Sequence, residues 1–203
     1  GGSMGILGLF LILMMTLIIA LNFNSVHQAL IIITILPVGF ASAIIGHGIE
    51  GHPVSILSVW GIIALLGVLV NDAVVFVDQF NRNLKNGLQV EAAVVEAGKS
   101  RFRPIILTSI TTVAGLYPLI LEKSFQAQFL VPMAISVAYG VLFGTYFILV
   151  FLPSLILAFN DFKRLIQWVW TGSKPSQIEV EPVHIYQQHL SEMLNELEPE
   201  TND

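Results

Sequence analysis

The residue of this sequence best placed to do chemistry is Asp72, which stands inside the apolar run from Gly67 to Val77. A carboxylate at membrane depth is costly unless it is protonated or paired, so such a residue is by default a candidate for proton or ion binding. Asn71 precedes it and can supply both a donor and an acceptor. The alternative is that Asp72 stays protonated and only donates a hydrogen bond between helices.

The spacing of the polar residues predicts partners for Asp72. It lies six residues before Asp78 at the membrane boundary, which places it roughly 9 Å inside. On the next apolar run, Arg101 and Thr108 are seven residues apart, roughly 10.5 Å, and two helical turns return to nearly the same face. We therefore expect Asp72 and Thr108 at similar depth. A face of hydroxyl groups that continues toward Gly115 could hydrate the carboxylate and pass it a proton.

Each of these residues also has a simpler explanation. Thr108 could hold helices together, at well under about 2 kcal/mol for each hydrogen bond. Arg101 and Arg103 could be anchors whose long side chains reach the membrane interface. His47 and His52 flank Gly51 and leave a weak metal-site alternative, but the histidines and acids form no metal-ligand spacing and no nucleophile–base set. We therefore predict neither an enzyme nor a cofactor or metal.

Composition defines the elements that must position these residues. The chain has 203 residues, of which 55% are hydrophobic and only 11% charged, against about 25% charged in soluble domains. Five apolar runs approach or exceed the length that crosses a bilayer, at 5–21, 29–46, 54–77, 104–121 and 129–159. The predicted fold class is an all-α polytopic membrane helix bundle with five spans. Small residues predict close helix packing at Gly61, Gly67, Gly115, Gly140 and Gly144.

Charge predicts the orientation. Five of the nine basic residues lie in the segment 78–103, and three more follow the fifth run. By the positive-inside rule this segment and the C-terminus are cytoplasmic, which puts the start of the chain outside. No secretory signal is present at that start, so we expect a piece of a longer protein.

The segments outside the apolar runs carry predictions of their own. Within 78–103, the residues Leu88 to Gly98 predict a short helix closed by its glycine. Residues 161–176 have the composition of an interfacial anchor. Residues 177–203 hold seven acids and no Lys or Arg, which predicts a solvated acidic tail, with an amphipathic helix from His184 to Leu197.

Four stretches resemble the C-terminal half of RND-superfamily efflux permeases. Within that superfamily, the resemblance is to the hydrophobe/amphiphile branch, which is the acriflavine-resistance or AcrB type. The resemblance covers about residues 5–165 and includes the order and spacing of the motifs. The stretches are Gly67-x-x-x-Asn-Asp-Ala-Val-Val-x-Val77, Arg101-Phe-Arg-Pro-Ile-Ile-Leu-Thr-Ser109, Gly115-Leu-Tyr-Pro-Leu119 and Gln126-Ala-Gln-Phe-Leu-Val-Pro-Met133.

The resemblance implies a proton-driven exporter. It implies a trimer in the bacterial inner membrane that works with a periplasmic adaptor and an outer-membrane channel. The family's proton relay joins two aspartates of the N-terminal half to a Lys, an Arg and a Thr of the C-terminal half. By motif, the Lys position is Asn71, next to Asp72, and the Arg and Thr positions are Arg101 and Thr108. This chain has no Lys in that span, so Arg101 is the one cation near Asp72 in the motif.

The large periplasmic domains of the family do not occur in this sequence, so the chain is not expected to transport by itself. We expect it to contribute proton coupling and helix scaffolding beside the N-terminal half, within the lipid bilayer and without nucleic acid. Two alternatives stay open. One is a scaffold half whose Asp72 never titrates, and the other is an independent small membrane protein that acts in assembly or regulation.

Overall fold

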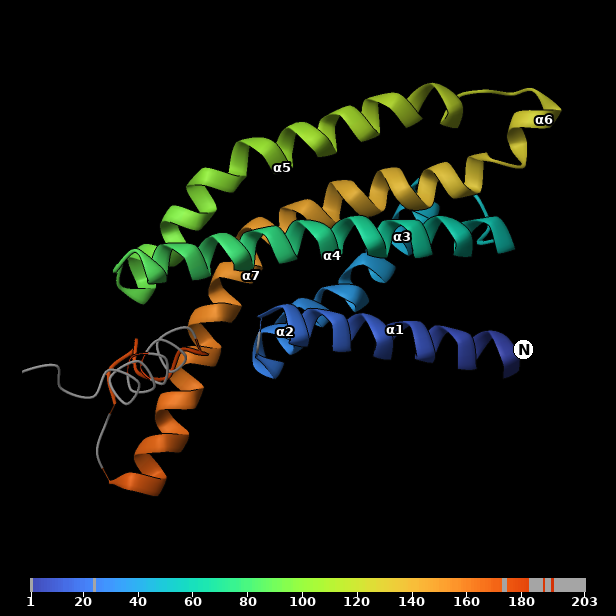
Figure 1. The fold of residues 1–203 in the computed structure, drawn as a ribbon. Helices are drawn as coiled ribbons and strands as arrows, with labels where there is room; N and C mark the ends of the chain where they lie inside the picture. Colours follow the sequence, from blue (N-terminus) through green and yellow to red (C-terminus); the bar gives the residue numbers. More distant parts are fainter. Residues whose placement is uncertain (1, 24, 173–174, 183–187, 189–190, 192–203) are drawn as a thin grey trace, which may run out of the picture.

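The protein is a bundle of helices (Figure 1). The structure, a computed structural model, describes residues 2–23, 25–172, 175–182, 188 and 191, and every regular element in them is helical. Four segments are long and apolar enough to cross a membrane, and α1 is a further apolar helix. The predicted all-α membrane helix bundle is confirmed. The elements are α1 (Gly2–Phe23), α2 (Val26–Ile33), α3 (Ile35–Glu50), α4 (Ile56–Lys85), α5 (Val90–Ile120), α6 (Phe125–Gln128) and α7 (Val131–Thr171).

Helix α7 is the centre of the bundle. It packs against α3, α4 and α5, and α4 also packs against α3 and α5. In Figure 1, α4, α5 and α7 run along one another, while α1 and α2 lie on the other side of α4 from α5. The core between α4 and α7 includes Leu65, Leu69, Ile148 and Leu152, none more than 1% exposed.

Local sequence explains where several helices begin and end. α2 ends at Ile33 because Pro37 has no N–H to bond the Ile33 carbonyl, so α3 starts afresh after Thr34. α4 begins with a capping box in which the side chains of Ser55 and Ser58 bond each other's backbone N–H groups. α3 ends at Gly51, whose φ of 68° is left-handed.

The polar segment 78–103 differs from its prediction. The predicted short helix ending at Gly98 is wrong, because α5 runs unbroken from Val90 through Gly98 and Pro104 to Ile120. The glycine that turns the chain is Gly87, with a φ of 86°, whereas Gly98 keeps a helical backbone. α4 likewise continues past residue 77 to Lys85. The two membrane helices thus extend toward each other and leave only a short turn.

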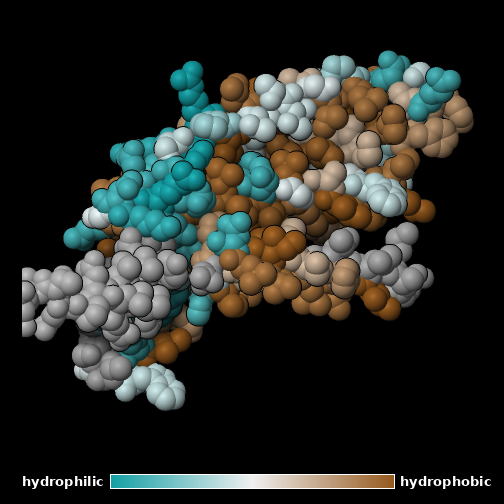
Figure 2. Space-filling model, viewed as in Figure 1, coloured by the Kyte–Doolittle hydropathy of each residue, from teal (hydrophilic) through white to brown (hydrophobic). Residues whose placement is uncertain are grey.

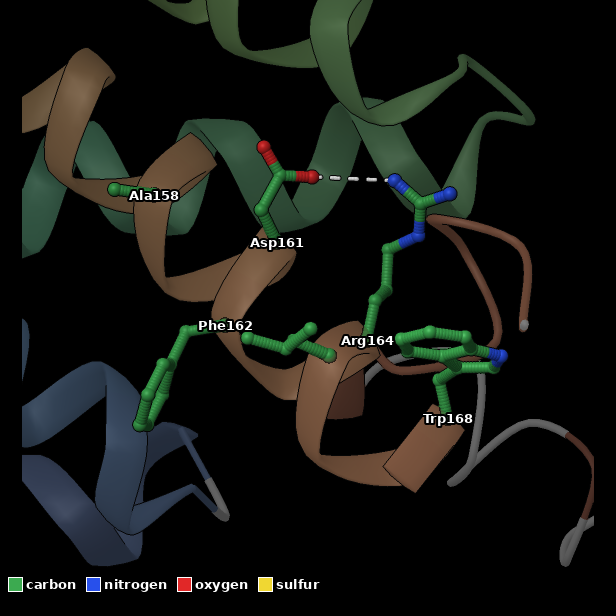
Figure 3. A pocket seen from close by; sticks show the side chains of 6 residues that line it. Ala158, Asp161, Phe162, Arg164 and Trp168 are labelled. Carbon is green, nitrogen blue, oxygen red and sulfur yellow. Dashed lines mark hydrogen bonds and ion pairs between the residues drawn. The ribbon is translucent and has the colours of Figure 1, made fainter. Parts of the chain in front are cut away.

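The predicted interfacial anchor at 161–176 is instead largely the end of α7, which continues to Thr171. Phe162, Leu165 and Trp168 are exposed there and line a groove of about 590 Å³. Figure 3 shows Asp161 and Arg164 facing each other in that groove, with an Oδ1–Nη1 distance of 3.1 Å. The apolar side chains of this last part of α7 face outward, as an anchor's would.

The start of the acidic tail is docked, which corrects the prediction that 177–203 is solvated throughout. Glu181 is 2% exposed, and its Oε1 accepts from Asn160 Nδ2 at 2.6 Å and lies 3.7 Å from Lys163 Nζ. Asn160 Nδ2 also donates to the Gln177 carbonyl at 2.9 Å, and Arg164 Nε donates to the Pro175 carbonyl at 3.1 Å. We call residues 175–182 the docked segment. The helix predicted at His184–Leu197 lies largely outside the described residues.

The five glycines predicted at helix contacts divide into two groups. A Cβ on Gly140 would lie 2.1 Å from Leu65 Cδ2, one on Gly144 2.6 Å from Leu69 Cδ2, and one on Gly61 2.7 Å from the Met133 carbonyl oxygen. These three allow α4 and α7 to approach closely. A Cβ on Gly67 or Gly115 would meet nothing within 4 Å in the described part of the chain, so for these two close helix packing stays a prediction.

The two ends of the bundle differ in polarity. Figure 2 shows hydrophilic side chains gathered where α4 ends and α5 begins, and hydrophobic ones over the lengths of the helices. We call the first region the basic end and the region of residues 47–58 and 121–131 the opposite end. The basic end contains Arg82, Lys85, Lys99, Arg101 and Arg103.

Candidate functional site

Asp72 lies in the middle stretch of α4, on the edge of its packed face. It is half-buried between exposed Asn71 and fully buried Ala73. Among the interactions of the described residues, none is a hydrogen bond or an ion pair of Asp72. The carboxylate therefore has its acceptor positions open to groups from outside this part of the chain.

Arg101 is held at the basic end by an amide and not by the carboxylate. Its Nη2 donates to Gln79 Oε1 at 2.9 Å, and Gln79 lies seven residues beyond Asp72 on α4. The guanidinium is half-buried, and its Nε is buried without a partner among the described residues. The predicted neighbour Arg103 is exposed. The Nε–H of Arg101 is thus a buried donor that is free to bind a further acceptor.

A row of amides holds Gln79 in place. Gln79 Nε2 donates to Asn83 Oδ1 at 3.0 Å, which turns the Gln79 oxygen toward Arg101. Asn83 is buried, and its Nδ2 donates to the Ala93 carbonyl of α5 at 2.9 Å. The row therefore ties α4 to α5 at two levels. We did not predict these two residues, although their spacing of four places them on one face of α4.

Thr108 makes no hydrogen bond to Asp72. Its hydroxyl is exposed and donates to the Pro104 carbonyl of its own helix at 2.9 Å. Thr111 and Thr112 likewise bond carbonyls of α5, and Gly115 is exposed. The predicted hydroxyl face therefore exists on α5 and is directed largely away from the rest of the described chain.

The buried face of α5 carries a polar contact that the sequence analysis missed. Ser109 Oγ lies 2.5 Å from Thr145 Oγ1 of α7, and both residues are buried. Ser109 also donates to the Ile105 carbonyl at 2.9 Å, so its oxygen accepts from Thr145. The neighbouring positions Thr108 and Ser109 thus have opposite roles, one on an open face and one in the packing of two helices.

A second missed contact joins α2 to α4. Gln28 Nε2 donates to Asn81 Oδ1 at 2.8 Å, and Asn81 Nδ2 donates to Gln28 Oε1 at 2.9 Å. Both side chains are buried, so the paired amides satisfy each other away from water. No sequence signal connects residues 53 positions apart, although a Gln and an Asn in predominantly apolar helices are themselves conspicuous.

Taken together, the four predicted relay residues occupy neighbouring helices but not one closed cluster. Asp72 and Thr108 share no hydrogen bond, Asn71 is exposed, and Arg101 is bound to Gln79. What the arrangement offers is a carboxylate without a hydrogen-bond or ion-pair partner in the described part of the chain, a fixed cation and an open hydroxyl face. These groups can bind and pass a proton if a further helix surface completes the site.

Comparison with known proteins identifies the family. Residues 1–160 match the AcrB/AcrD/AcrF family. The chain is 26% identical over 163 residues to the swarming motility protein SwrC of Bacillus subtilis (strain 168), covering 80% of this chain and 16% of that protein. It is 28% identical over 146 residues to the nickel and cobalt resistance protein CnrA of Cupriavidus metallidurans, covering 72% of this chain and 13% of that protein.

A third relative is the multidrug resistance protein MdtC of Erwinia amylovora, 27% identical over 153 residues, which are 75% of this chain and 15% of that protein. The chain therefore spans only 13 to 16% of the length of these relatives. The resemblance to RND permeases inferred from the motifs is confirmed by a match that covers the whole helical bundle up to residue 160. This chain belongs to the AcrB/AcrD/AcrF family.

Proposed function

We propose that this chain is the C-terminal membrane portion of a proton-driven efflux permease and that Asp72 takes up and releases the coupling proton. The observation that carries the proposal is a half-buried carboxylate in the middle of an apolar helix, with no hydrogen bond or ion pair to the residues that the structure describes. A group in that position titrates at a lower cost than one fixed in an ion pair, because no internal partner must be broken.

The polar surroundings have distinct roles in this proposal. Asn71 offers a donor and an acceptor beside the carboxylate. Arg101 supplies positive charge from the basic end, and Thr108 heads the open hydroxyl face along which a proton can move. Protonation removes the charge of Asp72 and so its attraction to Arg101, which is the kind of local change that biases two helix arrangements.

The missing surface belongs to other parts of the permease. We propose that the N-terminal half packs on the open face of α4 and α5 and that the complete protein is a homotrimer of the bacterial inner membrane. A periplasmic adaptor and an outer-membrane channel would bind through domains outside this chain, which does not transport alone. The basic end and the C-terminus lie on the cytoplasmic side in this arrangement.

The cargo is not chosen by this portion. The relatives are named for roles that range from multidrug resistance to nickel and cobalt resistance and to swarming motility. Relatives with such different roles share this part of the chain, which supports a role in driving export and not in selecting its substrate.

The second candidate is a scaffold half in which Asp72 never titrates. It is favoured by the hydrogen bonds of Arg101 and Thr108, which are made to Gln79 and Pro104 and not to Asp72. In this case the N-terminal half would carry all of the proton coupling.

Asp72→Asn in the complete permease separates the two candidates. A compound against which the wild-type permease protects cells is chosen first, and resistance and membrane levels are then measured for the variant. We expect resistance to be lost at an unchanged membrane level. The matched control is Asp78→Asn, which removes an exposed carboxylate bonded to Arg82 and should keep export. Undiminished resistance with Asn at position 72 would eliminate the coupling role and leave the scaffold.

A further inference from the structure

A buried histidine lies at the opposite end of the bundle, far from the basic end along the helices. His47 is 3% exposed and belongs to the last turn of α3. Its Nδ1 is 3.2 Å from the carbonyl oxygen of His52, and its Nε2 is 3.0 Å from Ser136 Oγ on α7. Both ring nitrogens therefore have a protein partner, away from water.

Glycines build this environment. Gly51 turns the chain after α3, so that the His52 N–H bonds the His47 carbonyl at 3.2 Å and the His52 carbonyl meets the His47 ring. A Cβ on Gly61 would lie 3.0 Å from Ser136 Cβ, so α4 approaches α7 at the level of the Ser136 hydroxyl. The site is thus formed by α3, its following turn, α4 and α7.

The hydrogen-bond inventory determines where protons can be. The His52 carbonyl only accepts, so His47 Nδ1 carries a proton and donates to it. Ser136 has one hydroxyl proton and two neighbours, namely His47 Nε2 and the Pro132 carbonyl oxygen at 3.1 Å. Neutral His47 accepts that proton at Nε2. Protonated His47 donates from Nε2 to the Ser136 oxygen, whose own proton then goes to Pro132.

Both protonation states are therefore fully hydrogen-bonded in one arrangement of heavy atoms. To keep every hydrogen bond when the ring gains a proton, the Ser136 hydroxyl rotates from the ring to the Pro132 carbonyl. A buried histidine with an apolar neighbour at Nε2 would have no such second state, because its added N–H would lack an acceptor.

We infer that His47 is a reversible proton-binding site at the opposite end of the bundle, with Ser136 as the group that adapts to its two states. The ligand is a proton, and the site is separate from Asp72. Its role in transport, as the acceptor on the side from which protons enter, rests on the proposed function, whereas the proton site itself does not.

The charged and titratable groups around His47 suit this role. Glu50 lies one turn further along α3 and accepts a hydrogen bond from the Tyr139 hydroxyl of α7. Tyr117 of α5 is close enough to interact electrostatically with Tyr139, and the His52 side chain is exposed. On the connection from α5 to α6, Glu122 and Lys123 are exposed and make no hydrogen bond or ion pair with His47. Glu50 is thus the carboxylate nearest to His47 along the chain.

The proton site is tested by nuclear magnetic resonance of the 203-residue chain in lipid nanodiscs, with ¹⁵N-labelled histidine. The signals of His47 are assigned by their loss in His47→Gln. At alkaline pH we expect one neutral tautomer with the proton on Nδ1. Lowering the pH should convert it reversibly to the doubly protonated ring while the chain stays folded. A ring that stays in one protonation state at every pH at which the chain is folded overturns the inference.

Ser136 provides the matched variants. Ser136→Ala removes the acceptor of the Nε2 proton. The variant should therefore need a proton concentration about tenfold higher or more before half of the His47 rings are protonated. Ser136→Thr keeps the hydroxyl and should leave the midpoint pH of His47 nearly in place. If both variants fold and the midpoint pH of His47 is the same in them as in the wild type, the role given to Ser136 is contradicted.

Transport assays in the complete permease then separate this inference from the proposed function. His47→Gln should change the pH profile of export, while Asp72→Asn should abolish export at every pH. An unchanged profile in His47→Gln overturns the transport role of the site. Persistent export in Asp72→Asn overturns the proposed function and leaves the titration result for His47 as it stands.

Discussion

The guanidinium of Arg101 donates to the side-chain oxygen of Gln79 at 2.9 Å, which joins α5 to α4 seven residues from Asp72. Because the Nε of Arg101 is buried without a partner among the described residues, the side chain has capacity for one more acceptor. The bond to Gln79 therefore holds the cation in position without using all of its donors.

This relationship predicts different effects of removing either partner. Arg101→Ala in the complete permease should lower export as severely as Asp72→Asn, because the positive charge near the carboxylate is lost. Gln79→Ala removes the bond but keeps the charge, and should retain most of the export. The measurement is resistance at matched membrane levels, with the exposed Arg103→Ala as a control that stays near wild type. Equal losses in the Arg101 and Gln79 variants would mean that the link between helices matters and the charge does not.

The glycines of α7 and α4 predict opposite changes in stability for the same substitution. Gly140→Ala places a methyl group against fully buried Leu65 and should lower the free energy of unfolding by about 1–3 kcal/mol. Gly67→Ala meets nothing within 4 Å and should raise it by about 0.5–1 kcal/mol, since alanine suits a helix better than glycine. Denaturant unfolding in detergent micelles measures both. Similar values for the two variants would show that α4 and α7 are not closely packed.

The docked segment predicts a local change at the C-terminal end. Glu181→Ala removes the acceptor of Asn160 and the partner of Lys163, so residues 175–182 should leave α7. Limited proteolysis within this segment should become faster by about tenfold or more, since hydrogen bonds to a charged group are worth about 1.5–3 kcal/mol. Glu179→Ala is the control, because that side chain is exposed and, within the described part of the chain, accepts a hydrogen bond only from the nearby Ser176 N–H. Unchanged cleavage in the Glu181 variant would contradict the docking.

Much of the fold could be predicted because the length of an apolar run is a local property of the sequence. The helix that runs through Gly98 could not, since glycine permits both a helical and a left-handed backbone and packing decides between them. Val94 and Ala97 beside it are buried, which holds the helix together there.

The candidate site was predicted only in part, for a related reason. Spacing along one helix predicts similar depths for Asp72 and Thr108, but it does not determine the rotation of α5 about its own axis. That rotation turns Ser109 inward to Thr145 and leaves Thr108 outside. The contacts of Gln28 with Asn81 and of Glu181 with Asn160 join residues distant in sequence, and so depend on how the elements cross.

The docked segment also determines where the protein can be cut. A chain ended at Thr171, the last residue of α7, would keep Asn160 and Lys163 but lose the carboxylate that both of them contact. Asn160 is buried, and both hydrogen bonds of its Nδ2 are made to the docked segment, so this chain end would lose them together. Fusion partners or shortened variants that are to keep these contacts should therefore be joined beyond residue 182.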